Sequence, residues 1–270
     1  MTEVAPITEE EYAHFQQFIY QAAGIDLGPT KKVLVAARLA KRLRHHRLNS
    51  FEQYYHLING NTYPQEKQIA IDLLTTNETY FFREPAHFDF LRNKILSTWK
   101  SGRLFRAWSA ASSTGEEPYT LAMVLADKLG MTPWEIIASD ISTRVLEAAR
   151  KGHYAMVRTE GIPKDFLRKY CLKGKGSQEG TLLIDRKLRE HVHFRQINLN
   201  QPLPDIGQFD IIFLRNILIY FDQSTKQAMV KRILQQLKPG GHFFIGHSET
   251  MKGINNSIKL VAPTIYQKPV

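Results

Sequence analysis

Long hydrophobic runs are missing from this chain of 270 residues, and cysteine is almost absent. No apolar stretch approaches the ~18 residues that a membrane-spanning helix needs. The first residues lack the basic and apolar regions of a signal peptide, and the single cysteine, Cys171, has no partner for an internal disulfide. These absences exclude a transmembrane helix and a disulfide-stapled fold, and they predict a cytoplasmic protein.

Acidic residues are scarce in two regions of a chain whose net charge is +10. Residues 31–47 hold seven Lys and Arg and no acid, and residues 151–195 hold eleven against five acids. Such asymmetry predicts acidic partners, whether nucleic acid, anionic lipid or an acidic protein surface. A solvated face that only aids solubility is the alternative for each region.

The first 76 residues carry helical patterns and no strand-like alternation. Thr8 and Glu11 form a capping box before a helix that ends at Gly24. Further helices are predicted over 30–47, from Ser50 onward, and over 65–74. On the helix at 30–47, a rotation of about 100° per residue separates a basic side from an apolar one. The basic side holds Lys31, Arg38, Lys41, Arg42 and His45.

From about residue 103, strands alternate with helices, which predicts an α/β domain with a mainly parallel sheet. The predicted strands are 104–109, 135–139, 192–197, 210–214 and 242–246, and the predicted helices are 118–129, 142–151 and 224–237. Pro239-Gly240-Gly241 is predicted to turn the chain into the last of these strands. We expect a helical domain over 1–76, a linker over 77–102 and the α/β domain over 103–270.

Residues 153–191 interrupt this alternation, because loops in such folds usually span only ~2–6 residues. Two short apolar runs, 170–173 and 181–184, flank the glycine-rich segment Gly174–Gly180. This pattern predicts a β-hairpin. The whole segment is therefore expected to form a small inserted subdomain.

The turn after the first predicted strand suits a cationic nucleoside. Its sequence, Ser-Ala-Ala-Ser-Ser-Thr-Gly-Glu-Glu-Pro (109–118), occupies the position where doubly wound sheets bind ligands. It lacks the Gly-x-Gly-x-x-Gly pattern that lets a backbone approach a pyrophosphate, and Glu116 and Glu117 put negative charge there instead. S-adenosylmethionine has an ammonium group, a sulfonium group and no phosphate, so it fits this turn. A tight turn that only caps a helix is the alternative.

Polar residues also end the later strands. Asp140 follows the second strand, where an acid accepts hydrogen bonds from ribose hydroxyls or caps the next helix. Arg215 and Asn216 interrupt an apolar stretch after the fourth strand, so a ligand or a structural polar network is expected to satisfy them. Tyr220 lies on the same loop, and the pair Asn198-Leu199 is placed similarly after the third strand.

Five segments, taken together, make the sequence specific. They are Thr-Thr-Asn-Glu-Thr-Tyr-Phe-Phe-Arg-Glu (75–84), Trp-Ser-Ala-Ala-Ser-Ser-Thr-Gly-Glu-Glu-Pro-Tyr (108–119), Ala-Ser-Asp-Ile (138–141), Arg-Asn-Ile-Leu-Ile-Tyr-Phe (215–221) and Gly-His-Ser-Glu (246–249). In this order they resemble the CheR chemotaxis receptor methyltransferases. The resemblance implies a small all-helical N-terminal domain and a class I, Rossmann-like methyltransferase domain with a small antiparallel β-subdomain.

The resemblance also implies an activity, the S-adenosylmethionine-dependent methylation of glutamate side chains on methyl-accepting chemotaxis receptors. The products would be glutamyl methyl esters and S-adenosylhomocysteine. Glu117 would bind the methionine end of the cofactor and Asp140 its ribose, while Arg83 and Tyr220 would orient the methyl acceptor. No metal is implied. The full set implied around the cofactor is Asn77, Thr79, Arg83, Glu117, Asp140, Asn198, Leu199, Arg215 and Asn216.

Two receptor contacts are implied as well. The basic helix would bind the acidic receptor bundle through Arg38, Lys41 and Arg42. Some family members also add an acidic, aromatic C-terminal pentapeptide of the receptor as a strand to the β-subdomain. The turn at Gly174, Lys175 and Gly176 has the full length of such members. We expect a monomer that neither binds nucleic acid nor inserts into a membrane.

Three other functions share parts of this pattern. An RNA methyltransferase would use the same cofactor turn and positive charge, but an aromatic RNA-binding platform is not evident. A nicotinamide oxidoreductase is disfavoured by the missing glycine pattern. A receptor-binding module without catalysis would have a damaged cofactor turn, whereas this turn is intact.

Overall fold

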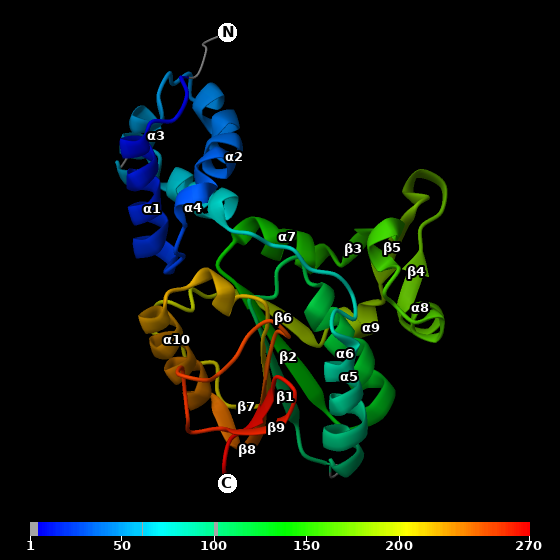
Figure 1. Ribbon diagram of the computed structural model, residues 1–270. Coiled ribbons are helices and arrows are strands. Elements are labelled where there is room, and N and C mark those ends of the chain that lie inside the picture. Colours follow the sequence, from blue (N-terminus) through cyan, green and yellow to red (C-terminus); the bar gives the residue numbers. More distant parts are fainter. Residues whose placement is uncertain (1–4, 61, 100–101) are drawn as a thin grey trace.

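The computed structural model describes residues 5–60, 62–99 and 102–270. Residues 1–4 and 61, in the predicted helical domain, and 100–101, in the predicted linker, lie outside the described residues. Figure 1 shows a helical bundle on one side of an α/β domain, with a small separate sheet projecting from it. None of the described helices is long and apolar enough to cross a membrane.

Four helices form the N-terminal domain, as the sequence predicts. They are α1 (Glu9–Ala23), α2 (Lys32–His45), α3 (Phe51–Asn59) and α4 (Pro64–Leu74), and a 3-10 turn, η1 (Pro29–Lys31), precedes α2. The capping box of α1 is confirmed, since Thr8 Oγ1 accepts from Glu11 N and Glu11 Oε2 accepts from Thr8 N. Arg47 has a left-handed φ of 57°, so α2 ends before the predicted boundary.

The basic side of α2 is only partly free. Arg42 Nε and Nη2 donate to Glu66 at 2.7 and 2.6 Å, and Tyr54 Oη donates to the same carboxylate at 2.8 Å. Because Glu66 is 3% exposed, the charge of Arg42 is already paired inside the bundle, and its predicted receptor contact stays a prediction. Arg38 donates to the carbonyl of Leu74, whereas Lys41 is exposed.

A seven-stranded sheet forms the centre of the α/β domain. Its strands are β1 (Phe105–Ala110), β2 (Trp134–Asp140), β6 (Val192–Gln196), β7 (Phe209–Leu214), β8 (Leu237–Ile245), β9 (Lys259–Ala262) and β10 (Ile265–Gln267). The order across the sheet is β6-β2-β1-β7-β8-β10-β9, and β10 is antiparallel to both of its neighbours. The other neighbouring pairs are parallel, which confirms the predicted sheet type.

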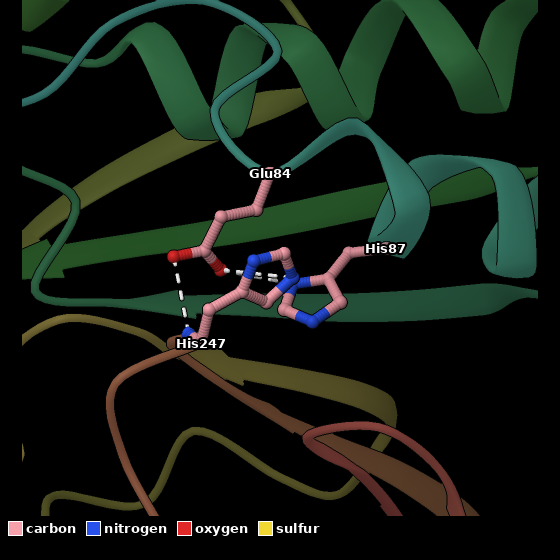
Figure 2. A group of neighbouring side chains, drawn as sticks. All are labelled: Glu84, His87 and His247. Atoms are coloured by element: carbon pink, nitrogen blue, oxygen red, sulfur yellow. Dashed lines mark hydrogen bonds and ion pairs between the residues drawn. The ribbon is translucent and has the colours of Figure 1, made fainter.

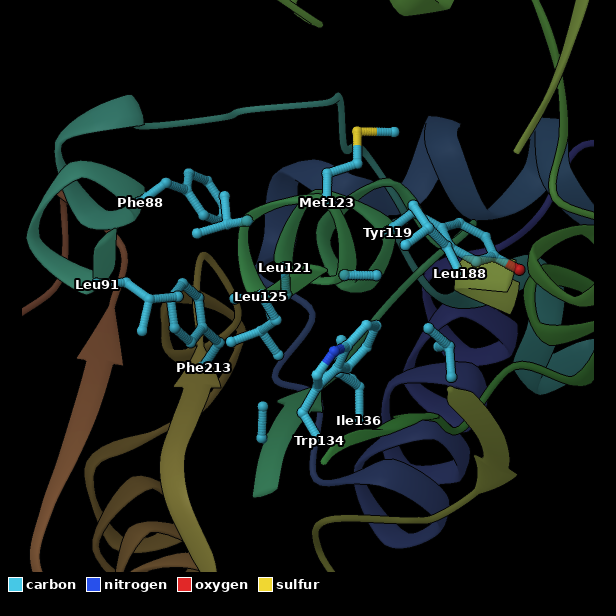
Figure 3. Packing of buried hydrophobic residues seen from close by; sticks show 14 of the residues in the cluster. Phe88, Leu91, Tyr119, Leu121, Met123, Leu125, Trp134, Ile136, Leu188 and Phe213 are labelled. Atoms are coloured by element: carbon cyan, nitrogen blue, oxygen red, sulfur yellow. The ribbon is translucent and has the colours of Figure 1, made fainter. Parts of the chain in front are cut away.

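Helices cover both faces of this sheet, and they include α6 (Glu116–Leu129), α7 (Thr143–Lys151) and α10 (Gln223–Gln235). Figure 3 shows Leu121 and Leu125 of α6 beside Ile136 of β2 in one buried cluster. Ile211 and Ile212 of β7 belong to different clusters, because successive side chains of a strand point to opposite faces. The bundle has a third cluster of its own.

Two expectations differ from the structure. The predicted turn Pro239-Gly240-Gly241 lies within β8, because the backbone of both glycines pairs with Lys268. The predicted linker contains α5 (Pro85–Phe90), a π-helix, η2 (Leu91–Ile95), and a 3-10 turn, η3 (Leu96–Thr98). Its buried residues, such as Leu91, join the main core of the α/β domain. The linker prediction missed these helices because single short turns leave little periodicity in a sequence.

The inserted segment contains the predicted hairpin and one strand that the sequence did not reveal. Strands β4 (Cys171–Lys173) and β5 (Thr181–Ile184) pair in antiparallel register, and β3 (His153–Ala155) pairs with the other side of β5. The helices here are α8 (Lys164–Tyr170) and α9 (Arg186–Arg189), with 3-10 turns η4 (Met156–Thr159) and η5 (Gly176–Gln178). A strand of three residues is too short to show alternation, which explains why β3 was missed.

The helical domain is fastened to the edge where the parallel strands end. Asp72 of α4 accepts hydrogen bonds from the backbone N–H groups of Thr143 and Arg144, so it caps the N-terminus of α7. Asn198 Nδ2 donates to the carbonyl of Ala22 at 2.7 Å. These polar contacts place the bundle over the carboxyl ends of β2 and β6.

Replacing Glu66 with alanine should lower the free energy of unfolding by roughly 2–4 kcal/mol, because Arg42 would lose its partner for a half-buried charge. Urea denaturation would measure this change. Glu10→Ala, at an exposed position of α1, is the matched control and should change stability by less than ~0.5 kcal/mol. Equal effects in both variants would contradict a structural role for the Arg42–Glu66 pair.

The same pair predicts a pH dependence. Burial alone would raise the pKa of Glu66, but hydrogen bonds from Arg42, His46 and Tyr54 lower it from 4.5 to about 2. The ionised carboxylate therefore stabilises the fold above pH 4.5, and this contribution is lost as the pH falls toward 2. The stability difference between the wild-type protein and Glu66→Ala should shrink over that range.

Candidate active site

A cavity of about 420 Å³ lies at the carboxyl ends of the parallel strands, below the helical domain. Its wall includes every residue that the sequence resemblance implies for cofactor and acceptor. These are Asn77, Thr79, Arg83, Glu117, Asp140, Asn198, Leu199, Arg215, Asn216 and Tyr220. Residues from distant parts of the chain therefore meet at one site, as expected for the edge at which parallel strands end.

The turn between β1 and α6 bends sharply toward this cavity. Ala111 and Ser113 have left-handed backbones, with φ of 67° and 49°. Gly115 has φ of 96°, and a Cβ at this position would lie 2.9 Å from Ala149 Cβ and from Tyr154 Oη. The turn thus needs glycine at 115 alone, and its tightness brings small side chains and backbone against the cavity.

Asp140 stabilises the start of the next helix, and its predicted contact with a ribose stays a prediction. Its Oδ2 accepts from Ser113 N and its Oδ1 from Ser142 N, each at 2.9 Å. Burial raises the pKa of Asp140, although these backbone hydrogen bonds act in the opposite direction. The carboxylate therefore stabilises the start of α7 and the first turn, and it also forms part of the cavity wall.

A buried guanidinium connects two carboxylates beside the cavity. Arg215 lies 3.2 Å from Glu117 Oε2 through Nη1 and 3.0 Å from Glu84 Oε2 through Nη2, and its side chain is 2% exposed. Glu117 Oε1 accepts from Ser109 Oγ at 2.7 Å. Burial raises the pKa of Glu117, and the charge of Arg215 opposes this shift. The polar network expected around Arg215 is present, and both Arg215 and Glu117 line the cavity.

The hinge segment supplies another part of the wall. Arg83 Nη1 donates to the carbonyl of Glu78 at 3.0 Å, and its guanidinium lies 5.6 Å from the centre of the Tyr80 ring. Asn77 holds the first turn, because its carbonyl accepts from Ser113 Oγ at 2.8 Å. Arg83 is thus tied only to its own segment in these contacts, so its side chain can change partners when a ligand enters.

The sequence did not indicate the contribution of the helical domain to this wall. Asp26, Leu27 and Leu34 line the cavity together with Lys31 and Arg38 of the basic region. Nothing in the pattern of a surface helix shows which of its residues will face another domain. Only the docking of the bundle on the sheet decides this.

Glu84 is a further residue that the sequence analysis did not single out as part of the site. Its Oε1 accepts from Asn216 Nδ2 and from the backbone N–H of His247, both at 3.1 Å. Figure 2 shows the rings of His87 and His247 beside this carboxylate, and ligand atoms of the three residues lie within 4.8 Å of one another. Arg215 lies at the same carboxylate, so a cation other than a metal ion already balances its charge.

Two domain models of one protein family match this chain, one after the other. "CheR methyltransferase, all-alpha domain" matches residues 10–75, and "CheR methyltransferase, SAM binding domain" matches residues 77–267. The chain belongs to the CheR methyltransferase family. The predicted family and fold class are therefore confirmed, and S-adenosylmethionine is the methyl donor that this membership indicates.

Relatives extend over nearly the whole chain. A chemotaxis protein methyltransferase of Escherichia coli (strain K12) is 41% identical over 269 residues, which cover 98% of this chain and 93% of that one. A chemotaxis protein methyltransferase 2 of Pseudomonas aeruginosa is 41% identical over 262 residues, with coverage of 96% and 93%. Among solved structures, TrmN from Thermus thermophilus has 14% identity and a TM-score of 0.42 over 67% of this chain and 47% of that one. That likeness is too remote to bear on function.

The cavity of this CheR protein has the chemistry that S-adenosylmethionine requires. Its volume lies within the ~300–1,000 Å³ typical of small-molecule sites. Glu117 provides an anionic group for an ammonium, and Asp140 provides a carboxylate for hydroxyl groups. The first turn has one glycine where a pyrophosphate cradle uses three, so a nucleoside without phosphates suits it best.

Replacing Asp140 with alanine should weaken the binding of S-adenosylhomocysteine by roughly 1–3 kcal/mol, because a charged hydrogen-bond acceptor is lost. Isothermal titration would measure the affinity, and urea denaturation would measure the stability that Asp140 contributes through Ser113 and Ser142. Asp210→Ala is the matched control, since Asp210 is paired with Lys238 at 2.7 Å and does not line the cavity. It should lose stability and keep its affinity. Unchanged affinity in Asp140→Ala would remove Asp140 from the site.

Proposed function

We propose that this protein transfers the methyl group of S-adenosylmethionine to glutamate side chains of chemotaxis receptors. The observation that carries the proposal is one cavity with two kinds of residue in its wall. Glu117 and Asp140 suit the cofactor, while Arg83 and Tyr220 suit a carboxylate acceptor. The names of the E. coli and P. aeruginosa relatives place them in chemotaxis, which supports a chemoreceptor as the substrate.

Five residues of the cavity wall have separate tasks in this reaction. Glu117 pairs with the ammonium group of the cofactor, and Asp140 accepts hydrogen bonds from its ribose. Asn198 already donates its amide to Ala22, so it acts mainly as a wall that links the cofactor to the helical domain. Arg83 and Tyr220 hold the acceptor carboxylate in line with the methyl group.

No residue has to remove a proton. A glutamate carboxylate has a pKa of ~4.3 and is ionised near pH 7. S-adenosylmethionine supplies an electrophilic methyl group, which the carboxylate oxygen accepts while the electron pair of the carbon–sulfur bond stays on sulfur. Catalysis therefore comes from alignment, which can supply several kcal/mol. A guanidinium holds a carboxylate in a fixed orientation, so we assign Arg83 an orienting role.

Two surfaces are proposed to bind the receptor. The first surface is the basic side of α2, where Lys41 is exposed. Arg38 and Lys31 lie where the helical domain meets the cavity. Positively charged side chains are therefore present both on the outer surface and at the cavity. The second surface is the edge of β4, which pairs only with β5 in the described sheet of the insert. An acidic, aromatic receptor tail can add there as a further strand.

The turn that follows β4 is built on glycine. A Cβ on Gly174 would lie 1.9 Å from the carbonyl oxygen of Gln178, and Gly174 N donates to the carbonyl of Thr181 at 2.9 Å. The hairpin therefore continues beyond β4 to residue 174. Lys175 and Gly176 form its tip, and Leu172 is 53% exposed on β4, which provides an apolar contact for an aromatic side chain.

Replacing Arg83 with alanine should lower kcat by about 100-fold, because the acceptor would lose its alignment, and should change the affinity for S-adenosylmethionine far less. The assay transfers a tritiated methyl group to a receptor fragment and, in parallel, to bulk RNA. Label on the receptor should be released by alkali, as expected for an ester. Arg92→Ala is the control, because Arg92 pairs with Asp127 on the surface, and it should keep full activity. Label on RNA alone would instead support the RNA methyltransferase alternative.

The two receptor surfaces predict different effects on tailed and tailless receptors. Lys41→Glu should slow methylation of both, and the defect should shrink as salt rises because exposed charges are screened over ~8 Å at physiological ionic strength. Deletion of residues 175–177 should slow methylation of the tailed receptor only. Each variant is the control for the other. A salt-independent defect in Lys41→Glu, or equal effects of the deletion on both receptors, would contradict the corresponding surface.

A further inference from the structure

A second groove, of about 320 Å³, lies at the edge of the main sheet. It shares no described residue with the wall of the active-site cavity. Its wall combines α6, the end of α7, α9 and β6, through Tyr119, Arg150, Arg189 and residues 192–195. The volume lies within the ~300–1,000 Å³ typical of small-molecule sites, and the proposed methyl transfer does not use this groove.

Two arginines from different helices bring positive charge to this groove. Arg150 Nη2 donates to the carbonyl of Phe194 at 3.1 Å, and Arg189 Nε donates to the carbonyl of Ile184 at 3.1 Å. Among the described residues, neither guanidinium has an ion pair or a further hydrogen bond. A guanidinium carries five N–H donors, so most donors of both arginines stay available to a ligand.

Contacts with the fold hold both side chains in place. Gly152, directly after α7, has φ of 60°, and a Cβ at this position would lie 2.7 Å from Arg189 Cδ. Glycine at 152 therefore lets the stem of Arg189 cross the end of α7. Arg150 is fastened to the edge of β6 through the carbonyl of Phe194. Arginines that are already oriented lose less side-chain entropy when they bind an anion.

The edge of β6 adds a backbone donor. The carbonyl of His191 and the N–H of Ile197 bond to β2, so the odd-numbered residues of β6 face that strand, because the bonded side alternates along the chain. The N–H and C=O of Phe194 therefore point outward, and Arg150 occupies the C=O. This contact hinders the addition of a further strand at the edge, which favours a small ligand over an extended peptide.

Apolar side chains form the floor of the groove. Tyr119 and Val192 are buried in the main core, and Phe194 packs against it. The ring centroids of Tyr119 and Phe194 are 5.7 Å apart, and Figure 3 shows Tyr119 beside Leu188 of α9. The hydroxyl of Tyr119 donates to the carbonyl of Ala149. The floor therefore offers ring surface to an organic group.

The charges around the groove leave it positive. Its described wall contains no carboxylate. His193 and Arg195 lie on the other face of β6, since side chains alternate along a strand, and both are exposed. Of the nearby acids, Glu147 is exposed on α7 outside the wall, and Glu190 pairs with Arg186 at 2.7 Å. Unbalanced positive charge of this kind attracts anions.

We propose that this groove binds a small phosphorylated ligand of the nucleoside diphosphate class. Arg150, Arg189 and the N–H of Phe194 would hold the phosphates, because guanidinium groups match the oxygens of phosphate and a diphosphate supplies charge for both arginines. The base would lie against the ring surface of Tyr119 and Phe194. The site is separate from the methyl-transfer cavity and does not rest on the proposed function.

The test is isothermal titration of the intact protein with inorganic pyrophosphate and with ADP, in the presence of excess S-adenosylhomocysteine. The excess keeps the adenine of ADP out of the active-site cavity, and pyrophosphate has no adenine. Both probes should bind, and ADP should bind more tightly because it also contacts the floor. Arg150→Gln and Arg189→Gln should each weaken both affinities about tenfold, because charge-assisted donors are lost.

The matched control is Arg186→Gln, which removes the same charge from α9 at an exposed position outside the groove. It should keep both affinities. Arg150→Lys keeps the charge but loses the planar fork, so it should also weaken binding. Thermal unfolding checks that each variant is folded, and Arg189→Gln provides the comparison if Arg150→Gln is not.

The outcomes are distinct from those of the methyl-transfer assay. A wild-type protein that binds neither probe at millimolar concentration would overturn the inference and leave the proposed function intact. Equal losses in Arg186→Gln would also overturn it, because binding would then reflect general surface charge. Binding that S-adenosylhomocysteine abolishes would place the probe in the active-site cavity instead. ADP that binds no more tightly than pyrophosphate would overturn the part assigned to Tyr119 and Phe194.

Discussion

The buried guanidinium of Arg215 is the interaction on which the site depends. An isolated charge in such a place would cost many kcal/mol, so Arg215 requires carboxylates from two other segments. Glu84 comes from the start of α5 and Glu117 from the first turn of α6. This need for charge pairing fixes the hinge segment, the first turn and the loop after β7 relative to one another. Phe88 and Phe213 add apolar and cation–π contacts to the same group.

The parallel sheet explains why the segments meet at all. Strands β1, β2, β6 and β7 end at one edge, and each is followed by a loop with a polar residue. The helical domain covers this edge through Asp72 and Asn198, so the cavity has walls from both domains. In the proposed reaction, an acceptor side chain would enter between them, which would couple recognition by the helical bundle to chemistry on the sheet.

The proposed function gives separate parts of the chain separate tasks. The sheet loops would bind the cofactor, the hinge would present Arg83, and α2 and the edge of β4 would provide surfaces for a large acidic partner. Because the insert is packed onto the main core through residues such as Phe166 and Leu182, a partner bound there is held at a constant distance from the cavity. Tethering of this kind raises local concentration without changing the reaction.

Much of this protein could be predicted from its sequence, because the signals are local. The capping box at Thr8, the alternation of strands and helices, and the hairpin around Gly174 each depend on residues a few positions apart. The residues at the ends of strands were predictable for the same reason, since any residue after a parallel strand faces the ligand edge. Short elements such as β3 and the turns after α5 carry too little periodicity to be seen.

Pairing between distant residues was decided only by the tertiary structure. The sequence marks Arg42 as a basic surface residue, but the packing of α2 on α4 brings it to Glu66. The sequence marks Arg215 as a buried charge, but Glu84, 131 positions away, becomes its partner only when the hinge folds against β7. Composition and spacing record which charges exist, and the free energy of burying them depends on neighbours that the fold alone supplies.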